Sequence, residues 1–336
     1  MAGTTLMARS LTVRAEAWPL ARPFRISRGT KTAAEVVVAE VSAEQGGRRI
    51  VGRGECVPYL RYGETVEAVV AAVRAEADAL AEGLSREELL EQMPAGAARN
   101  ALDCALWDFE AKASGIPAWI RAGLAEPRPA VTAETVALGP PDEMAATASG
   151  LQDRPLLKLK MGADGVMERV AAVRQAAPGA RLIVDANEGW SLDLLKEIAP
   201  QLAALGIEMI EQPLPADADG ALAEFASPVP LCADESFHGL ADLAKLAGYR
   251  AVNVKLDKAG GLTAALVLAR AAREAGLAVM VGCMVATSLA MAPAMLLAGL
   301  ADVLDLDGPL WLAHDRQPPL HFGNGVVHPP DPALWG

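Results

Sequence analysis

The sequence predicts a (β/α)₈ barrel preceded by a smaller α+β domain. From about residue 130 onward, short apolar runs alternate with helical periodicity, and eight such runs follow one another at spacings of 21 to 27 residues. The runs end at Thr135, Lys160, Asp185, Glu211, Asp234, Lys255, Gly282 and Asp305. An open doubly wound sheet is the alternative, but it would not usually have eight units of such even length, and no GxGxxG follows any of the runs.

The chain before residue 126 has an α+β pattern. Strand-like stretches over 35–41 and 49–55 flank a Gly-Gly turn, which is typical of an antiparallel hairpin. Helical periodicity follows over 65–82 and 96–114. We expect an N-terminal α+β capping domain over residues 1–125, a TIM-like barrel over 126–310, and a C-terminal tail over 311–336 that returns to the capping domain.

The composition restricts the possible partners and location. The net charge of −12 and pI of about 4.9 argue against nucleic acid or an anionic membrane as a partner. The start of the chain has no apolar run of signal-peptide length, and no apolar stretch reaches roughly 18 residues. The four cysteines lie far apart, as in a reduced protein, so we expect a cytoplasmic location. A homo-oligomer is possible, but the sequence does not specify an oligomeric state.

Two lysines share one side of the second barrel strand. Lys158 and Lys160 alternate with leucines, so both side chains should point into the barrel or its mouth. A buried ammonium needs a partner, because an unpaired buried charge is costly. The alternative is a pair of solvated lysines at a strand edge.

Carboxylates end the next three strands and supply candidate partners. A single one of Asp185, Glu211 and Asp234 would more often be a helix N-cap or a salt-bridge partner. Three on neighbouring strands would converge and repel one another without a cation. Oxygen ligands in this number favour one Mg²⁺ per subunit, and no histidine ends a strand to favour zinc.

Lys255 ends the sixth strand, which lies opposite the second strand in an eight-stranded barrel. Lys160 and Lys255 would therefore face a bound substrate from two sides. A divalent metal on a carboxylate stabilises the enediolate formed when the neighbouring α-proton leaves. We expect nearby cations to lower the pKa of the lysines toward working pH, and two bases on two faces would permit inversion.

The eighth strand ends with two acidic residues on one side. An Asp-Gly turn would explain Asp307 alone. Together, Asp305 and Asp307 beside a lysine-lined site suggest an acceptor for a substrate cation such as an α-ammonium group.

Taken together, these motifs resemble the enolase superfamily, its muconate-lactonizing subgroup, and more narrowly the L-Ala-D/L-Glu (dipeptide) epimerases. The resemblance spans nearly the whole chain. It rests on residues 22–29, 54–59, 97–108, 158–160, 185–188, 211–214, 233–236, 255–261 and 305–309. Pairing a lysine base with Mg²⁺ is already known for this superfamily, so that combination is not new to this chain.

The resemblance implies a role for each site residue. Asp185, Glu211 and Asp234 would be the Mg²⁺ ligands, Lys160 and Lys255 the acid/base catalysts, Lys158 the cation that holds the developing enolate, and Asp305 and Asp307 the acceptors of the dipeptide's amino group. Capping loops around 25–31 and 58–64 would cover the barrel mouth. Arg28, or Arg25 if the alignment slips, would meet the side-chain carboxylate. Thr135 resembles a substrate-contacting position, and Cys283 is either a small residue beside the substrate or a packed core thiol.

The predicted function is epimerisation of a dipeptide, with L-Ala-Glu from peptidoglycan turnover as the favoured substrate. An o-succinylbenzoate synthase or a muconate-type cycloisomerase is the alternative, but its substrate would leave Asp305 and Asp307 without a partner. A barrel kept only for binding is disfavoured because every expected catalytic group is present. Gly282 stands where a mandelate-racemase-like member or a sugar-acid dehydratase would place a histidine.

Overall fold

The computed structural model describes residues 8–27 and 29–336. Its N-terminal part is built on an antiparallel sheet in the order β1-β2-β3. The strands are β1 (Ser10–Ile26), β2 (Gly29–Gln45) and β3 (Arg48–Cys56). The hairpin of β2 and β3 agrees with the prediction and pairs Val37 with Cys56. The sequence did not predict β1, which pairs with β2 along almost its whole length.

Helices cover one face of this sheet. They are α1 (Val66–Ala75), α2 (Ala77–Glu82), α3 (Arg86–Gln92), α4 (Ala97–Ser114) and α5 (Ala118–Arg121). The single helix expected over 65–82 is broken at Glu76, which lies between α1 and α2. Two glycines of β3 let α4 approach the sheet closely: a Cβ on Gly52 would lie 2.2 Å from the Phe109 nitrogen, and one on Gly54 2.1 Å from the Ala101 carbonyl oxygen.

Eight parallel strands form the predicted barrel, in sequential order. They are β5 (Glu134–Val136), β6 (Leu156–Lys160), β7 (Arg181–Asp185), β8 (Ile207–Glu211), β9 (Leu231–Ala233), β10 (Ala251–Val254), β11 (Ala278–Gly282) and β12 (Val303–Asp305). The Ala133 N–H donates to the Leu304 carbonyl at 2.8 Å and joins the first and last strands. Every observed strand end lies within one residue of its predicted position, and the barrel architecture is confirmed.

The connections between the strands are less regular than predicted. The helices are α6 (Pro141–Gly150), α7 (Val166–Ala176), α8 (Leu192–Ala204), α9 (Leu256–Ala259), α10 (Leu262–Glu274) and α11 (Ser288–Ala294). The 3₁₀ turns are η1 (Leu60–Tyr62), η2 (Asp219–Glu224), η3 (Leu240–Lys245), η4 (Met295–Leu300) and η5 (Gly308–Trp311). The expectation of an amphipathic helix after β8 and after β9 was therefore wrong. Four prolines between 213 and 230 break helical hydrogen bonding after β8, and glycines at 239 and 248 flank the short turn after β9.

The strands place their interior residues in levels along the barrel axis. The lower apolar level consists of Ala133, Leu156, Ile183, Met209, Cys232, Ala251 and Met280, with Val303 packed against them. Alternate residues of a strand point to the same side, so the residue two positions later on each strand also faces the interior. The apolar level therefore forms a floor beneath whatever those next residues build.

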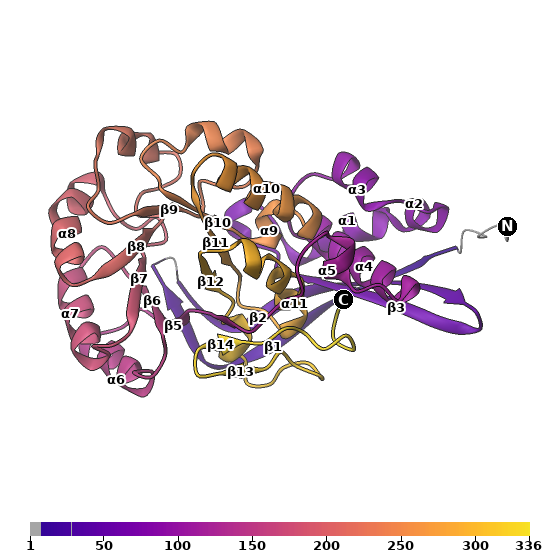
Figure 1. Ribbon diagram of the computed structural model, residues 1–336, viewed down its shortest axis with the longest axis horizontal. Coiled ribbons are helices and arrows are strands. Elements are labelled where there is room, and N and C mark those ends of the chain that lie inside the picture. Colours follow the sequence, from indigo (N-terminus) through magenta and orange to yellow (C-terminus); the bar gives the residue numbers. More distant parts are fainter. Residues whose placement is uncertain (1–7, 28) are drawn as a thin grey trace.

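The C-terminal tail packs against the N-terminal part. It contains β13 (Phe322–Gly323) and β14 (Val326–Val327), which pair with each other, and β14 also pairs with β4 (Ala130–Val131). The Ala313 N–H donates to the Pro19 carbonyl at 2.9 Å, and the Arg316 guanidinium contacts buried Glu55 at 2.6 Å. Figure 1 shows the yellow tail beside the indigo strands β1 and β2, while their hairpin reaches toward the barrel. Within the described residues, no helix has the length and apolarity needed to cross a membrane.

Candidate active site

Polar side chains form the level directly above the apolar floor. Each member of this level stands two residues beyond a member of the apolar level, and all but Lys158, in the middle of β6, lie at or beside the carboxyl end of their strand. The eight residues are Thr135, Lys158, Asp185, Glu211, Asp234, Asn253, Gly282 and Asp305. All the charged members are almost completely buried. Because carboxyl ends of barrel strands open at one face, this level brings the predicted site residues together.

On one side of the site, two lysines contact one aspartate. The Nζ of Lys160 lies 2.6 Å from Asp185 Oδ2, and the Nζ of Lys158 lies 3.1 Å from the same oxygen. Lys158 also contacts Glu211 at 2.6 Å and Asp305 at 2.7 Å. Burial alone would lower the pKa of Lys158, but these three carboxylates outweigh burial and hold the pKa well above its usual value. The three carboxylates therefore favour the charged form of Lys158.

On the opposite side, Asp234 is also held by two lysines. Lys255 Nζ lies 2.6 Å from Asp234 Oδ2, and Lys258 Nζ lies 2.6 Å from Asp234 Oδ1. Although burial acts to lower the pKa of Lys255, the Asp234 and Glu211 charges raise it well above its usual value. The ammonium is paired directly with a carboxylate, and the lowering of its pKa expected from a bound divalent cation stays a prediction.

Glu211 lies between these two sides. Burial, with the Asp185 charge adding to it, raises the pKa of Glu211 above its ordinary value. The Asn253 side-chain amide donates to Glu211 Oε1 at 2.7 Å. A Cβ on Gly282 would lie 2.5 Å from Asn253 Oδ1 and 2.7 Å from Nδ2. Gly282 therefore makes room for the asparagine that holds Glu211.

Two acidic residues of the eighth strand end face the same cavity. Asp307 Oδ2 accepts from the Thr135 backbone N–H at 2.7 Å and from the Trp311 indole N–H at 3.3 Å. Burial, with the Asp305 charge adding to it, raises the pKa of Asp307. Asp305 Oδ1 is buried and has no hydrogen-bond partner among residues 8–27 and 29–336. Asp305 and Asp307 together therefore have fewer cationic partners than carboxylate groups.

Part of this polar level borders a cavity of about 770 Å³ at the mouth of the barrel, while Lys158, Asp185 and Glu211 lie beneath it and are not among its lining residues. The barrel contributes Thr135, Lys160, Asp234, Lys255, Cys283, Asp305 and Asp307. The N-terminal part contributes Phe24, Ile26 and 29–33 from the β1–β2 hairpin and 58–62 after β3. Both segments expected to cap the mouth thus border the cavity. Cys283 borders it as well, and burial raises the pKa of its thiol.

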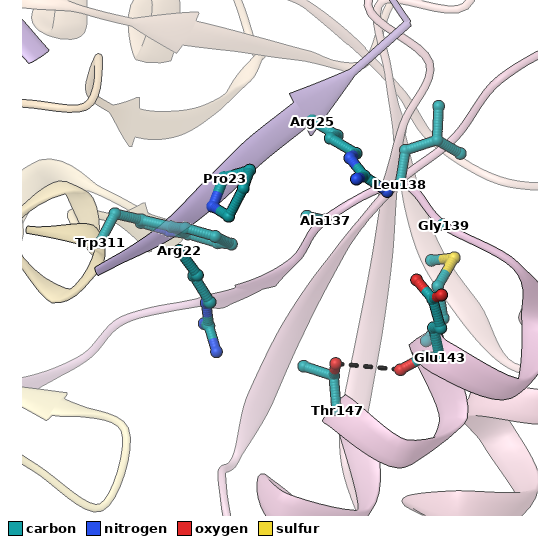
Figure 2. Close-up of a pocket in the computed structure, with 10 residues that line it drawn as sticks. Arg22, Pro23, Arg25, Ala137, Leu138, Gly139, Glu143, Thr147 and Trp311 are labelled. Carbon is teal, nitrogen blue, oxygen red and sulfur yellow. Dashed lines mark hydrogen bonds between the residues drawn. The ribbon is translucent and has the colours of Figure 1, made fainter. Parts of the chain in front are cut away.

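The candidate partners for a second substrate carboxylate lie in different places. Arg28 lies outside the described residues. Arg25 lines a separate cavity together with Arg22, Glu143 and Trp311, as Figure 2 shows. Phe24 and Ile26, its neighbours on the strand, face the barrel mouth instead, because alternate residues point to opposite sides. Lys31 is a cation that does line the mouth, and its Nζ lies 5.1 Å from the centre of the Tyr59 ring.

The donors at the strand ends suit a hard divalent cation in their chemistry. Carboxyl groups outnumber ammonium groups six to four among the buried residues Lys158, Lys160, Asp185, Glu211, Asp234, Glu235, Lys255, Lys258, Asp305 and Asp307. Carboxylate oxygens are the ligands that Mg²⁺ prefers. Among the described residues, no three acidic, histidine or cysteine side chains gather closely enough to enclose an ion, because lysine ammonium groups contact the carboxylates instead. The residues fit a divalent cation in charge and donor type. The lysine ammonium groups would have to move away from the carboxylates for the cation to bind.

Sequence comparisons agree with this architecture in both parts of the chain. Residues 143–333 match the family described as enolase C-terminal domain-like. Residues 8–120 match the N-terminal domain of the mandelate racemase/muconate lactonizing enzyme family. The chain belongs to the enolase superfamily. The resemblance predicted from the motifs is thereby confirmed.

Relatives within the enolase superfamily cover almost the whole chain. An L-Ala-D/L-Glu epimerase of Escherichia coli is 48% identical over 323 residues, covering 95% of this chain and 99% of the relative. A structure of an Agrobacterium tumefaciens enolase family member, described as homologous to dipeptide epimerases and holding sodium and L-Ala-L-Glu, has a TM-score of 0.94 and 50% identity and covers 98% of this chain and 100% of that one. A dipeptide epimerase of Methylococcus capsulatus with Mg and L-Arg-D-Lys has a TM-score of 0.89 and 31% identity and covers 98% and 99%.

The sequence analysis missed three residues that the structure places at this superfamily site. Asn253 supports Glu211, Lys258 contacts Asp234, and Tyr62 lines the cavity near Lys255. Asn253 could have been found from its position two residues before Lys255 on the same strand. Lys258 gives a weaker signal, a second lysine three residues after Lys255 at a helical spacing.

Proposed function

We propose that the protein is a dipeptide epimerase, an isomerase that inverts the α-carbon of the C-terminal residue, with L-Ala-D/L-Glu as the favoured substrate. The resemblance to an L-Ala-D/L-Glu epimerase over 95% of the chain supports this assignment. So does the set of buried lysines and carboxylates at the strand ends. Peptidoglycan turnover as the source of the substrate stays a prediction.

Lys160 and Lys255 are the proposed acid/base pair. Their strands, β6 and β10, are separated by three strands in either direction around the barrel, so the two ammonium groups approach the cavity from opposite sides. One lysine removes the α-proton and the other returns a proton to the opposite face. Lys255 Nζ lies 2.6 Å from Asp234 Oδ2, and a cation held by Asp234 would free this lysine to act as a base.

Asp185, Glu211 and Asp234 are the proposed holders of one Mg²⁺ per subunit. When bound, the ion would supply Lewis-acid stabilisation of the charge that develops on a substrate carboxylate. Lys158 adds a positive charge beside three strand ends, since it contacts Asp185, Glu211 and Asp305.

The observation that carries the choice of substrate class is the buried Asp305 Oδ1, which has no hydrogen-bond partner within the described part of the chain. A carboxylate oxygen at the wall of a cavity, beside a second carboxylate of raised pKa, is suited to accept an ammonium group. The free amino group of a dipeptide supplies one. The substrates of an o-succinylbenzoate synthase or a muconate-type cycloisomerase do not, which disfavours those alternatives.

The remaining substrate contacts, the domain boundaries and the cellular location stay predictions. Arg28 is the proposed partner of the glutamate side-chain carboxylate, while Thr135 and Cys283 are proposed to contact the substrate from the cavity wall. We also propose the domain boundaries near residues 125 and 310 and a cytoplasmic location.

Deuterium exchange tests the proposed function. The protein is incubated with Mg²⁺ and L-Ala-L-Glu in D₂O, and the glutamate α-proton is followed by NMR. We expect loss of that proton signal and the appearance of the L-Ala-D-Glu diastereomer. N-acetyl-L-Ala-L-Glu is the matched control, and its kcat/KM should be lower by about 10- to 100-fold because it lacks the charged amino group. Equal use of both compounds would contradict the role of Asp305 and Asp307, and no exchange on any dipeptide would contradict the epimerase assignment.

A further inference from the structure

Lys258 is a buried lysine that the proposed reaction does not use. It lies on α9, the single helical turn that follows β10, and only 2% of its surface is exposed. Lys255, three residues earlier, borders the cavity, whereas Lys258 is not among the described residues that line it. The Lys258 side chain reaches Asp234 from behind the site. It is therefore placed to act on Asp234 and not on a substrate.

All three N–H donors of the Lys258 ammonium have acceptors. They are Asp234 Oδ1 at 2.6 Å, the Asp234 carbonyl oxygen, and the Asn253 carbonyl oxygen at 3.0 Å. An ammonium group has three donors, so this one is fully used. A buried, fully bonded cation has a fixed position, and it has no donor left for a reacting group.

This arrangement fixes the orientation of Asp234. Its two carboxylate oxygens face two different lysines, Oδ1 toward Lys258 and Oδ2 toward Lys255 at the cavity. The Asp234 N–H also donates to the Gln212 side-chain oxygen at 2.9 Å. Turning the carboxylate would break the bond to Lys258 and leave a buried cation unpaired, which is costly. Oδ2 is therefore held toward the mouth of the barrel.

The same lysine supports a second carboxylate through Asn253. Lys258 holds the Asn253 carbonyl at the end of β10, and the Asn253 side chain donates to Glu211 Oε1 at 2.7 Å. We propose that Lys258 is a positioning residue that orients Asp234 directly, and Glu211 through Asn253, for a divalent cation. This inference rests on the proposed function, since Asp234 and Glu211 are proposed metal holders there.

Calorimetric titration with Mg²⁺ tests this role without relying on activity. Lys258→Met should weaken Mg²⁺ binding by about 10- to 100-fold, the usual cost of removing a group that orients a metal ligand. The activation constant for Mg²⁺ should rise in parallel, and most of kcat should return at saturating Mg²⁺ because Lys258 touches no substrate. If Lys258→Met does not fold, Lys258→Arg serves, because a planar guanidinium cannot reproduce the three donor directions and should also bind Mg²⁺ more weakly.

Lys112→Met is the matched control. Lys112 pairs with buried Asp108 at 2.7 Å on α4, so its loss should lower stability and leave Mg²⁺ affinity unchanged. Unchanged Mg²⁺ affinity in a folded Lys258→Met or Lys258→Arg protein overturns the inference while the proposed function stands. A kcat that stays low at saturating Mg²⁺ also overturns it. Failure of the wild-type protein to bind Mg²⁺ overturns both.

Discussion

The two sides of the active site contain the same parts connected in different ways. Each has a lysine at the cavity paired at 2.6 Å with a buried aspartate, Lys160 with Asp185 and Lys255 with Asp234. Each aspartate also contacts a second buried lysine. On the first side this is Lys158, on the second Lys258.

The second lysines differ in what else they hold. Lys158 belongs to a strand and also contacts Glu211 and Asp305, so it joins the proposed metal holders to the proposed ammonium acceptor. Lys258 belongs to a helical turn, and among the described residues it bonds only two groups besides the Asp234 carboxylate, the backbone carbonyls of Asp234 and Asn253. Lys158 therefore contacts three carboxylates of the site, whereas Lys258 contacts the carboxylate of Asp234 alone among the described residues.

The largest effect should come from removing either lysine at the cavity. Lys160→Met and Lys255→Met should each lower the rate of two-way epimerisation by roughly 10²- to 10⁴-fold, because inversion needs a proton acceptor on one face and a donor on the other. Polarimetry or NMR on L-Ala-L-Glu gives the rate. Retention of normal epimerisation in one of the variants would show that the two sides are not equivalent partners.

Replacing Lys158 separates the general support from the local one. Lys158→Met should lower exchange from both diastereomers to the same degree, by about 10²- to 10³-fold, because it removes a fixed charge shared by the whole site. Saturating Mg²⁺ should not restore the rate, in contrast to the effect expected for Lys258→Met. A loss confined to one diastereomer would place Lys158 on one face and contradict this distinction.

Filling the space at Gly282 tests the packing under Glu211. Gly282→Ala places a Cβ within 2.5 Å of Asn253 Oδ1, so the free energy of unfolding should fall by about 1–3 kcal/mol. Urea denaturation measures the change. Gly220→Ala is the control, since nothing lies within 4 Å of its Cβ position, and it should change stability by less than about 0.5 kcal/mol. Equal effects at the two glycines would show that Asn253 is free to move.

The smallest effect concerns the attachment of the Lys255 side to the N-terminal part. Asp257 Oδ1 accepts from the Val57 N–H at 3.0 Å and the Asn100 amide at 2.8 Å. Burial raises the pKa of Asp257 to about 7, so the native state keeps a proton that the unfolded state has lost. The stabilisation is complete below an unfolded pKa of about 3.9 and is lost as pH rises through about 7.

Asp257→Asn keeps the acceptor Oδ1 and removes the titration. Between about pH 6 and pH 8, the wild-type free energy of unfolding should fall by about 1 kcal/mol more than that of Asp257→Asn. Urea titrations across this pH range measure the difference. Parallel pH profiles for the two proteins would show that Asp257 is ionised throughout.

Much of the site could be predicted because strand alternation is a strict geometric rule. Once Lys160 is assigned to a strand end, Lys158, two positions earlier, must point to the same side of that strand and so into the barrel. Spacing along the chain predicted the carboxyl ends of the eight strands to within one residue. None of these predictions depended on the conformation of a loop.

The remainder depended on features that leave no periodic pattern. Lys258 is placed by the path of one helical turn after β10, and the pKa of Lys255 depends on a contact across strands. The 3₁₀ turns after β8 and β9 follow from proline and glycine breaks that outweighed the regular spacing. Strand β1 was not predicted although Leu11, Val13, Ala15 and Ala17 alternate with polar residues, and prolines at 19 and 23 interrupt that alternation in its second half.

Proton wash-out from each diastereomer tests the two-base account most directly. In D₂O with Mg²⁺, Lys255→Met should exchange the α-proton of one diastereomer of Ala-Glu without inverting it and leave the other unexchanged, because only Lys160 remains as a base. Lys160→Met should show the opposite preference. NMR of both diastereomers with both variants gives the result in one experiment. Exchange of both diastereomers at similar rates in either variant would contradict the account.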